Sequence, residues 1–255
     1  MIIDTHAHLY SKDFDDDREN AVMRAVDCGV KKMIIPGTKP EDSQKILDLC
    51  TKYPTVCFPA LAVHPEDLAE DFRSQLKMLE TRINESKYYA VGETGLDLYW
   101  DKTRFSDQKE ALIFHIELAS ALDLPLILHC REAFEPMTEI LKNHKKHNTR
   151  GVFHCFTGNT NQAKEIEDLG FMIGIGGVVT FKKSELKYTL REIGLKNVVL
   201  ETDCPYLSPV PYRGKRNEPA FLVNVVDFLA KELEVSPEEI ENTTSGNAER
   251  LFFNS

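Results

Sequence analysis

The chain alternates short runs of apolar residues with longer amphipathic stretches, a pattern that predicts strands alternating with helices. Leucine and isoleucine recur at spacings of three and four between the apolar runs, as at Leu76, Leu79 and Ile83, which is typical of a helix with one buried face. Two segments carry helix-start signals, Pro40-Glu41-Asp42 and Ser236-Pro237-Glu238-Glu239, the second with Ser before a Pro at the first helical position. The predicted strands are residues 2–6, 30–36, 56–63, 88–93, 124–129, 150–155, 171–176 and 197–202.

These predicted strands are apolar throughout, which indicates a parallel sheet that is covered by helices. Eight strand–helix units in 255 residues fit a (β/α)₈ TIM barrel, and we expect one domain over residues 1–255 with its site at the carboxyl ends of the strands. A doubly wound open sheet is the alternative, because periodicity alone does not reveal closure. Gly174-Ile175-Gly176-Gly177 lacks the G-x-G-x-x-G spacing of a dinucleotide-binding loop, and we interpret it as a glycine turn at the barrel mouth.

The composition narrows the possible partners and compartments. Asp and Glu number 41 against 31 Lys and Arg, which gives a formal net charge of −10 at pH 7. Such a surface repels nucleic acid, so a local basic segment would have to hold any DNA or RNA. The cysteines are too few for a disulfide framework, no apolar run approaches the ~20 residues that span a bilayer, and the first residues resemble no signal peptide. We expect a cytoplasmic protein with no membrane partner and infer no obligate protein partner.

Side chains that can bind metal ions end several of the predicted strands. Because the carboxyl ends of barrel strands converge on one mouth, we expect these side chains to meet there. His6 and His8 are two positions apart, so both rings point to the same side of an extended strand. Buried ionisable groups need partners, which favours a metal site over core packing. The set comprises His6 and His8 on the first strand, Glu93 on the fourth, His129 on the fifth, His154 on the sixth and Asp203 on the eighth.

This set is larger than one catalytic ion with an open position normally uses. We therefore predict two divalent ions about 3.5–4 Å apart with a carboxylate between them. Imidazole and carboxylate ligands without thiolates suit Zn²⁺, Mn²⁺, Fe²⁺ or Ni²⁺, whereas Mg²⁺ normally takes more oxygen ligands. The ligand types alone leave the choice of metal open.

The same residues lie in short motifs that occur in order along the chain. Together these motifs resemble the TatD family of metal-dependent deoxyribonucleases, a branch of the metal-dependent amidohydrolase superfamily of barrels, and the resemblance covers essentially the whole chain. It implies a one- or two-metal phosphodiesterase site, Mg²⁺-dependent deoxyribonuclease activity and, in some members, 3′→5′ exonuclease action. The motifs are Asp4-Thr5-His6-Ala7-His8-Leu9, Val63-His64-Pro65, Gly92-Glu93-Thr94-Gly95-Leu96-Asp97, His129-Cys130-Arg131-Glu132, His154-Cys155-Phe156-Thr157-Gly158, Glu201-Thr202-Asp203-Cys204-Pro205 and Arg213-Gly214-Lys215-Arg216-Asn217-Glu218-Pro219.

The resemblance also implies a role for each candidate ligand. Glu93 would bridge the two ions and Asp203 would bind metal; beside the implied roles, we interpret Asp203 as the residue that orients the attacking water and accepts its proton. The first ion would be held by His6, His8, Glu93 and Asp203, and the second by Glu93, His129 and His154. One position departs from the family pattern: His115 stands where members often carry Gln, and we interpret it as a surface or packing residue and not as a ligand.

The roles of two neighbours of these residues stay open, each with two interpretations. Arg131 is two positions after His129 and could contact a phosphate, or it could form a salt bridge to Glu201 or Glu93. His64 precedes Pro65 at the end of the third predicted strand and could contact substrate or make a structural hydrogen bond.

Other neighbours are expected to support the site without entering it. We expect Glu201, two positions before Asp203, to accept a hydrogen bond from a ligand imidazole, and Asp97 to cap the turn after the fourth strand. Cys130 and Cys155 should point toward the helix layer as small apolar residues, and no cysteine has an obvious base beside it for nucleophilic catalysis.

A short basic segment, with Arg213, Lys215 and Arg216, follows the eighth strand and could hold a phosphate backbone, although a solvated loop is the ordinary role of such a run.

From the ligand set and the family resemblance together, we expect a deoxyribonuclease that acts near ends or in single strands. The first alternative is a metal-dependent amidohydrolase or ester deacylase acting on a small molecule or aminoacyl substrate. Related amidohydrolases often carry a carboxylated Lys where this chain has Glu93, which argues against it. The second is a non-catalytic metal-binding scaffold, which the complete ligand set argues against.

Overall fold

The computed structural model describes residues 1–253, which form eight parallel strands alternating with helices. The strands are β1 (Ile2–Asp4), β2 (Val30–Gly37), β3 (Cys57–Leu61), β4 (Val91–Asp97), β5 (Leu126–Arg131), β6 (Gly151–Phe153), β7 (Phe171–Ile175) and β8 (Val198–Leu200). The helices are α1 (Arg18–Asp27), α2 (Ser43–Lys52), α3 (Phe72–Glu85), α4 (Phe105–Leu122), α5 (Phe134–Asn143), α6 (Thr160–Asp168), α7 (Leu186–Ile193), α8 (Leu222–Leu233) and α9 (Pro237–Phe252).

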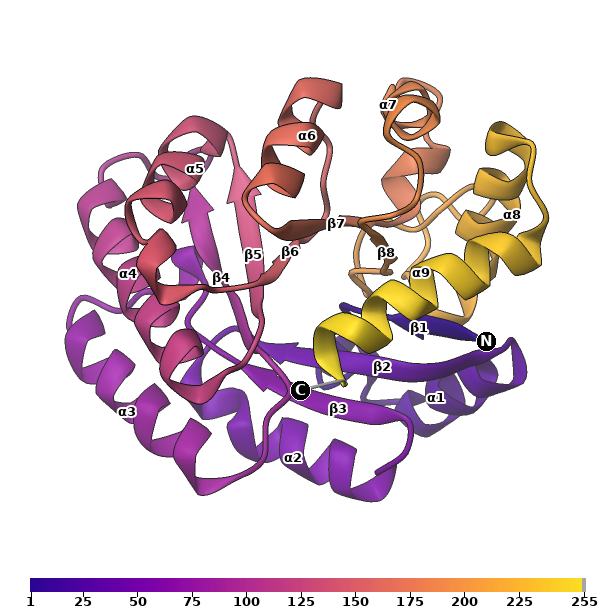
Figure 1. The fold of residues 1–255 in the computed structure, drawn as a ribbon. Coiled ribbons are helices and arrows are strands. Elements are labelled where there is room, and N and C mark those ends of the chain that lie inside the picture. Colours follow the sequence, from indigo (N-terminus) through magenta and orange to yellow (C-terminus); the bar gives the residue numbers. More distant parts are fainter. Residues whose placement is uncertain (254–255) are drawn as a thin grey trace.

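The strands lie in sequence order in two parallel sheets, one of β1 to β3 and the other of β4 to β8. A bridge between Ala60 and Ala90 joins β3 to the start of β4, and a bridge between Ala7 and Cys204 joins the segments that follow β1 and β8. The first and last strands therefore meet, as in a TIM barrel, whereas a doubly wound open sheet would keep its edge strands apart. Figure 1 shows helices α1 to α8 in a ring around the strands.

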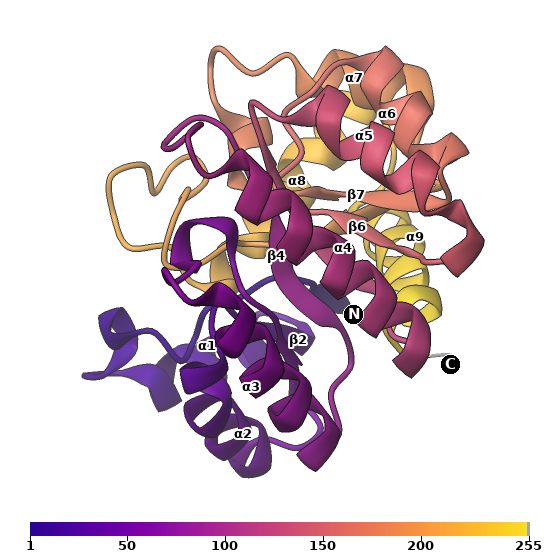
Figure 2. The same cartoon turned by 90° about the vertical axis from the view of Figure 1, so that its left-hand side faces the viewer.

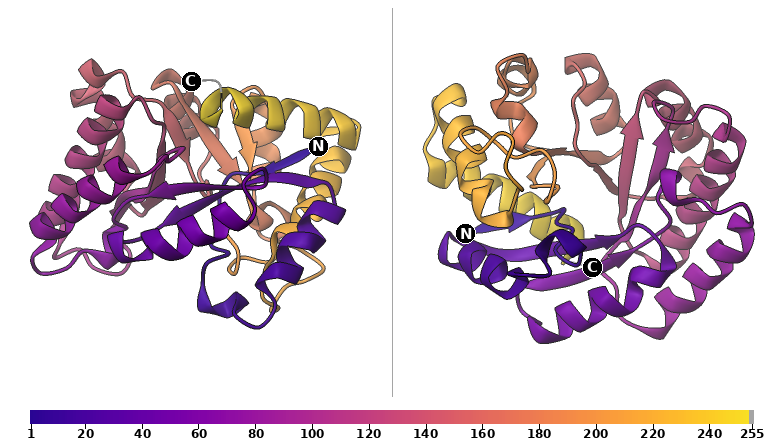
Figure 3. Two further views of the ribbon diagram at one scale, coloured as in Figure 1. Left: turned by 90° about the horizontal axis from the view of Figure 1, so that it is seen from below. Right: turned by 180° about the vertical axis from the view of Figure 1, so that it is seen from behind.

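The barrel interior is filled by apolar side chains from successive strands. Ile3, Ile34, Ile127, Val152 and Val199 belong to one buried cluster, and Ala248, Leu251 and Phe252 of α9 pack against it. Helix α9 crosses the ring in Figure 1 and so covers the amino-terminal end of the barrel. The loops after the strands gather at the opposite end, on the left of Figure 2, and the right-hand panel of Figure 3 is seen from that side.

The fourth strand differs most from the sequence-based prediction. It runs over Val91–Asp97 and not over 88–93, because Thr94 to Asp97 continue the pairing with Leu128 to Arg131 of β5. Gly95, with φ +147°, allows this pairing, since a Cβ at that position would overlap the backbone of His129. Glu93 therefore lies inside β4 and not at its end.

Of the two predicted helix starts, the one at Ser236-Pro237 is confirmed, and the one at Pro40 begins a short 3₁₀ turn before the helix. Helix α9 begins at Pro237, and the Ser236 hydroxyl accepts a hydrogen bond from the Glu239 N–H at 3.1 Å. At Pro40 the chain forms a short 3₁₀ turn, and α2 begins three residues later at Ser43. Within residues 1–253, none of the helices combines the length and apolar character needed to cross a membrane.

Candidate metal centre

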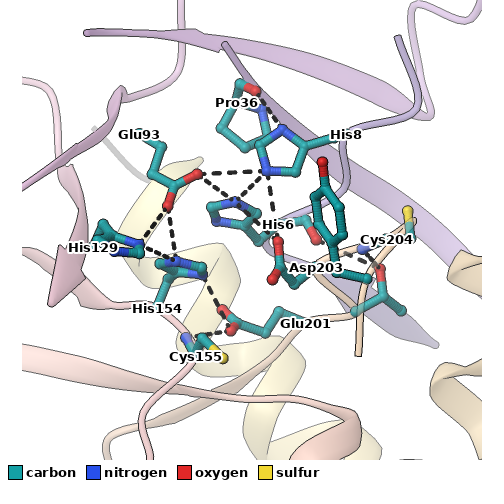
Figure 4. Close-up of polar contacts among 12 residues, drawn as sticks. His6, His8, Pro36, Glu93, His129, His154, Cys155, Glu201, Asp203 and Cys204 are labelled. Atoms are coloured by element: carbon teal, nitrogen blue, oxygen red, sulfur yellow. Dashed lines mark hydrogen bonds and ion pairs between the residues drawn. The ribbon is translucent and has the colours of Figure 1, made fainter. Parts of the chain in front are cut away.

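The six candidate ligands meet at the carboxyl ends of the strands (Figure 4). His6 and His8 lie just after β1, His154 directly follows β6, and Asp203 follows β8, while Glu93 and His129 lie within β4 and β5. His6 is fully buried, and His8, Glu93 and His154 are each at most 6% exposed. Side chains from five strand regions are thus brought within reach of one another.

A first group of donor atoms surrounds one point. The Nε2 atoms of His6 and His8 are 2.9 Å apart, and Glu93 Oε2 lies 3.1 Å and 3.4 Å from them. Asp203 Oδ1 lies 3.7 Å and 3.6 Å from the same two nitrogens. Ligands bound at about 2.0–2.2 Å to a common ion are separated by roughly 2.8–3.6 Å in octahedral or tetrahedral geometry. The two nitrogens and Glu93 Oε2 therefore have the spacing that a divalent ion requires, and Asp203 Oδ1 lies at the upper limit of this range.

A second group uses the other oxygen of the same carboxylate. Glu93 Oε1 lies 3.1 Å from His129 Nδ1 and 2.9 Å from His154 Nε2, and these two nitrogens are 3.5 Å apart. Figure 4 shows Glu93 between the two histidine groups, with one oxygen facing each. This is the arrangement expected of a carboxylate that bridges two ions.

Hydrogen bonds behind the rings set their protonation. His8 Nδ1 donates to the Pro36 carbonyl at 3.1 Å, and His129 Nε2 donates to Asp97 Oδ2 at 2.9 Å. A neutral imidazole has one N–H, so His8 Nε2 and His129 Nδ1 keep free lone pairs directed at Glu93. In the neutral form of these rings, imidazole lone pairs and carboxylate oxygens thus converge, and this donor set fits bound cations.

The surroundings of the carboxylates also favour positive charge. Burial opposes ionisation of Glu93, but the neighbouring histidines, His154 foremost, hold the pKa of its carboxyl well below its usual range. Burial likewise opposes ionisation of Asp203, but a hydrogen bond from His8 lowers the pKa of that group. Burial disfavours charge on His8, yet Asp203 and Glu93 raise the pKa of its imidazole to about 9. The carboxylates therefore attract positive charge to this point, which either protons or divalent ions can supply.

Glu201 lies behind His154 as predicted, but the predicted hydrogen bond from the imidazole is not formed, and His154 Nδ1 has no hydrogen-bond partner within residues 1–253. The Glu201 Oε1 atom is 3.5 Å from His154 Nδ1 and accepts a hydrogen bond from the Cys155 N–H. Gly174 makes room for it, because a Cβ at that position would overlap the Glu201 carboxylate. The glycine-rich strand end therefore accommodates the carboxylate that supports this imidazole.

Asp97 caps the turn after β4, as predicted, and has a second role that the sequence analysis missed. Its Oδ1 atom accepts hydrogen bonds from the N–H groups of Tyr99 at 2.9 Å and Trp100 at 3.0 Å. Its Oδ2 atom accepts the hydrogen bond from His129. Burial raises the pKa of Asp97, but His129 and the two backbone N–H groups lower it to about 2, so the group is ionised. The period-two spacing of residues 93, 95 and 97 was the available signal for this role.

His64 makes a structural hydrogen bond, one of its two predicted roles, and its contact with substrate stays a prediction. Its Nδ1 atom accepts from the Glu66 N–H at 3.1 Å, so the proton of a neutral ring is on Nε2, which lies 3.3 Å from Glu93 Oε1. The ring therefore faces the carboxylate between the two histidine groups, and His64 forms a candidate ligand group with Glu93 and His129.

His115 is not on the surface, which corrects one part of the sequence-based interpretation. It is fully buried in α4, where its Nε2 atom accepts from the Val63 N–H at 3.1 Å. Its Nδ1 atom donates to the Ala111 carbonyl at 2.6 Å and lies 2.9 Å from the Thr94 hydroxyl. Burial lowers the pKa of this imidazole to about 4. His115 therefore ties α4 to the residues beside His64 and Glu93, and it belongs to none of the candidate ligand groups of residues 1–253.

The basic residues near the site differ in whether their charges are already paired with a carboxylate. The Arg216 guanidinium pairs with both oxygens of Asp17, at 2.6 Å and 2.9 Å, and also donates to the Asp13 carbonyl. A neighbouring carboxylate thus neutralises the charge of Arg216, an ion pair that neither the phosphate interpretation nor the solvated-loop interpretation included. Arg213 and Lys215 are exposed and form no ion pair within residues 1–253, and the Arg213 guanidinium lies 3.7 Å above the Phe181 ring.

Arg131 forms neither of the salt bridges that the sequence left open. Its guanidinium carbon lies 4.0 Å from the centre of the Tyr99 ring, and no carboxylate of the described chain pairs with it.

The cysteines beside the ligands are poor nucleophiles, because burial raises the pKa of the Cys130 thiol to about 12 and that of Cys204 well above its usual range.

Comparison with known proteins identifies the relatives of this chain. A family model described as TatD related DNase matches residues 3–253. The chain belongs to the TatD family. A family relative named "Uncharacterized metal-dependent hydrolase YabD", from Bacillus subtilis (strain 168), is 36% identical over 253 residues, which are 99% of each chain. The chain is thus a TatD-type metal-dependent hydrolase.

Two further relatives extend the comparison within the family. One is a protein of Pectobacterium atrosepticum named "3'-5' ssDNA/RNA exonuclease TatD", which is 32% identical over 98% of this chain and 99% of its own length. The other is a crystal structure of YjjV, a TatD homologue from Escherichia coli K12, with a TM-score of 0.92 and 33% identity over 98% of this chain and 97% of that one. The fold inferred from the sequence is therefore confirmed.

Proposed function

We propose that this protein is a divalent-metal-dependent deoxyribonuclease, a single-domain cytoplasmic enzyme that hydrolyses phosphodiester bonds near the ends of DNA or in single strands. The observation that carries the proposal is the position of Glu93, whose two oxygens face two separate histidine groups. A pair of adjacent cation sites is the usual solution for phosphodiester hydrolysis, because it can stabilise charge on both the attacking and the leaving oxygen. The exonuclease name of the Pectobacterium relative supports the same class of substrate.

Under this proposal, each histidine group holds one ion. His6, His8 and Asp203 would hold the first and His129 and His154 the second, with Glu93 between them. Bound divalent ions supply Lewis acidity, which polarises a phosphate and makes water acidic enough to react near neutral pH.

Asp203 is the best candidate for the proton acceptor. Its Oδ1 atom faces His6 and His8, while Oδ2 has no hydrogen-bond partner within residues 1–253. Its side chain is 14% exposed, against 5% for Glu93, so water reaches Asp203 more readily. Oδ2 can therefore take a proton from an attacking water while Oδ1 stays directed at the histidines.

Other residues orient the reacting groups or hold the polymer. Asp97 keeps the His129 ring in one orientation, and Glu201 lies in the same position behind His154. Arg213, Lys215 and Arg131 have no carboxylate partner among residues 1–253 and can hold backbone phosphates, whereas the charge of Arg216 is already paired with Asp17.

The test is a substrate panel with controlled metal content. Protein treated with a chelator is reloaded with Mg²⁺, Mn²⁺ or Zn²⁺ and assayed on end-labelled single-stranded and duplex DNA, on bis-p-nitrophenyl phosphate, and on p-nitrophenyl esters and amides. We expect metal-dependent cleavage of DNA and of the phosphodiester, and its loss in Asp203→Asn. Asp227→Asn is the matched control, since Asp227 is exposed on α8. Turnover of esters or amides without any phosphodiester cleavage would overturn the proposal in favour of an amidohydrolase or deacylase.

A further inference from the structure

The loop between β4 and α4 exposes two adjacent aromatic side chains at the carboxyl end of the barrel. Tyr99 is 48% exposed and Trp100 is 63% exposed, and their rings are 4.9 Å apart at an interplanar angle of 87°. Large aromatic rings are usually buried, so a pair this exposed is typical of a surface that takes a partner.

A cation completes this surface. The guanidinium carbon of Arg131 lies 4.0 Å from the Tyr99 ring centre and 5.3 Å from the Trp100 ring centre. No acidic side chain of residues 1–253 forms an ion pair with Arg131, so its charge stays available to an anion. Aromatic faces beside an unpaired guanidinium are complementary to a nucleobase and the phosphate next to it.

This surface is attached directly to the metal centre. The carboxylate of Asp97 that accepts from the backbone N–H groups of Tyr99 and Trp100 also accepts from the His129 ring. The strand that carries His129 ends at Arg131, whose carbonyl accepts from the Leu98 N–H at 2.9 Å. A ligand bound to these rings therefore lies beside the second histidine group.

We propose that Tyr99, Trp100 and Arg131 form a binding site for one unpaired nucleobase of the DNA substrate, with the base stacked on the exposed Trp100 ring, Tyr99 beside it, and an adjacent phosphate facing Arg131. The inference rests on the proposed function, because it assigns part of the substrate to a surface beside the same centre. It also gives a physical basis for preferring single strands, since a paired base inside a duplex does not offer its faces. Stacking of one base changes affinity by about 5- to 150-fold.

The chain offers a direct reporter, because Trp100 is its single tryptophan. The wild-type protein is titrated with a single-stranded oligonucleotide that carries phosphorothioate linkages and resists cleavage, and the tryptophan fluorescence is recorded. Parallel titrations use an abasic strand of equal length and charge and a blunt duplex. We expect quenching by the single strand and little change with the abasic strand or the duplex. Equal quenching by the abasic strand would overturn the inference, because it would mean that phosphates alone affect the loop.

Variants then separate stacking from charge. Dissociation constants of labelled strands are measured by anisotropy for Trp100→Ala, Trp100→Phe and Arg131→Gln. We expect Trp100→Ala to weaken the base-containing strand by about 5- to 150-fold until it binds no better than the abasic strand, and Trp100→Phe to restore most of the difference. Arg131→Gln should weaken both strands by a similar factor. Tyr188→Ala is the matched control, since Tyr188 is 57% exposed on α7, and it should change neither constant.

The results separate this inference from the proposed function. Base-dependent quenching without cleavage of any phosphodiester would support the nucleobase site and overturn the deoxyribonuclease proposal. The opposite result would be that Trp100→Ala and Trp100→Phe both bind the strand as tightly as the wild type and still cleave single-stranded DNA. This would leave the proposed function standing and overturn the nucleobase site.

Discussion

The buried imidazole of His115 makes the stability of this protein sensitive to acid in a way that one substitution should remove. His115 is fully buried in α4 and neutral, and burial lowers the pKa of its imidazole to about 4 from an ordinary value of 6.5. The unfolded chain therefore binds more protons at this residue between these two values, so the contribution of His115 to stability is complete above pH 6.5 and is lost as the pH falls.

The size of the effect follows from the two pKa values of His115. Differential proton binding by a group with pKa values of about 4 and 6.5 lowers the free energy of unfolding by ~2 kcal/mol at pH 5 and ~3 kcal/mol at pH 4. The variant His115→Gln cannot take up this proton. It loses one of the ring's hydrogen bonds, at a cost of about 1 kcal/mol at neutral pH. We therefore expect the variant to be less stable than the wild type at pH 7 and more stable by about 1 kcal/mol at pH 5.

Urea unfolding followed by far-ultraviolet circular dichroism at both pH values measures this crossover. Any protonation of the histidines at the metal centre contributes equally to both proteins and cancels in the difference between them. If wild type and variant lost equal stability between pH 7 and pH 5, His115 would not be the buried neutral base that its contacts with Val63 and Ala111 indicate.

Other substitutions test the centre and its surroundings. Glu93→Gln removes the charge between the two histidine groups, and we expect plasma emission to show loss of one bound ion, with turnover reduced by ~10²-fold or more; two ions at the wild-type rate would refute the bridging role. Asp97→Asn places an amide N–H where His129 now donates, which favours the ring tautomer with a proton on Nδ1, and metal affinity measured by calorimetry should fall by about 10- to 100-fold. Arg216→Gln should lower the melting temperature by about 2–4 °C with little change in KM for an oligonucleotide, whereas Arg213→Gln should do the reverse, and a raised KM in Arg216→Gln would return that residue to the DNA-binding set.

The sequence predicted the members of the centre because two local rules sufficed. Apolar runs located the strands, and the barrel geometry placed residues such as His154 and Asp203 at one mouth. Period-two spacing placed Glu201 correctly behind the ligands.

Other features depend on contacts that no local pattern encodes. Arg216 is neutralised by Asp17, which is 199 positions away in the sequence, so its ion pair could not be read from the basic segment. The extent of β4 depended on the pairing that Gly95 allows, and this moved Glu93 into the strand and brought Asp97 to His129. The exposure of Trp100 had no periodic signal, because the residue lies in a loop.

The junction between the first and last strands has a consequence for stability. Backbone hydrogen bonds join the two segments there: Asp203 N–H donates to the His6 carbonyl at 2.8 Å, and His8 N–H donates to the Cys204 carbonyl at 2.9 Å. The side chains of His6 and His8 reach the first donor group from one edge of this seam, and Asp203 reaches it from the other. An ion held by these three residues would cross-link the segments that follow β1 and β8 in the native state, a cross-link that the unfolded chain cannot form. At a free concentration of 100 times its dissociation constant, such an ion stabilises the native state by about 2.7 kcal/mol. The cation would then hold the two ends of the barrel wall together as well as serve the chemistry.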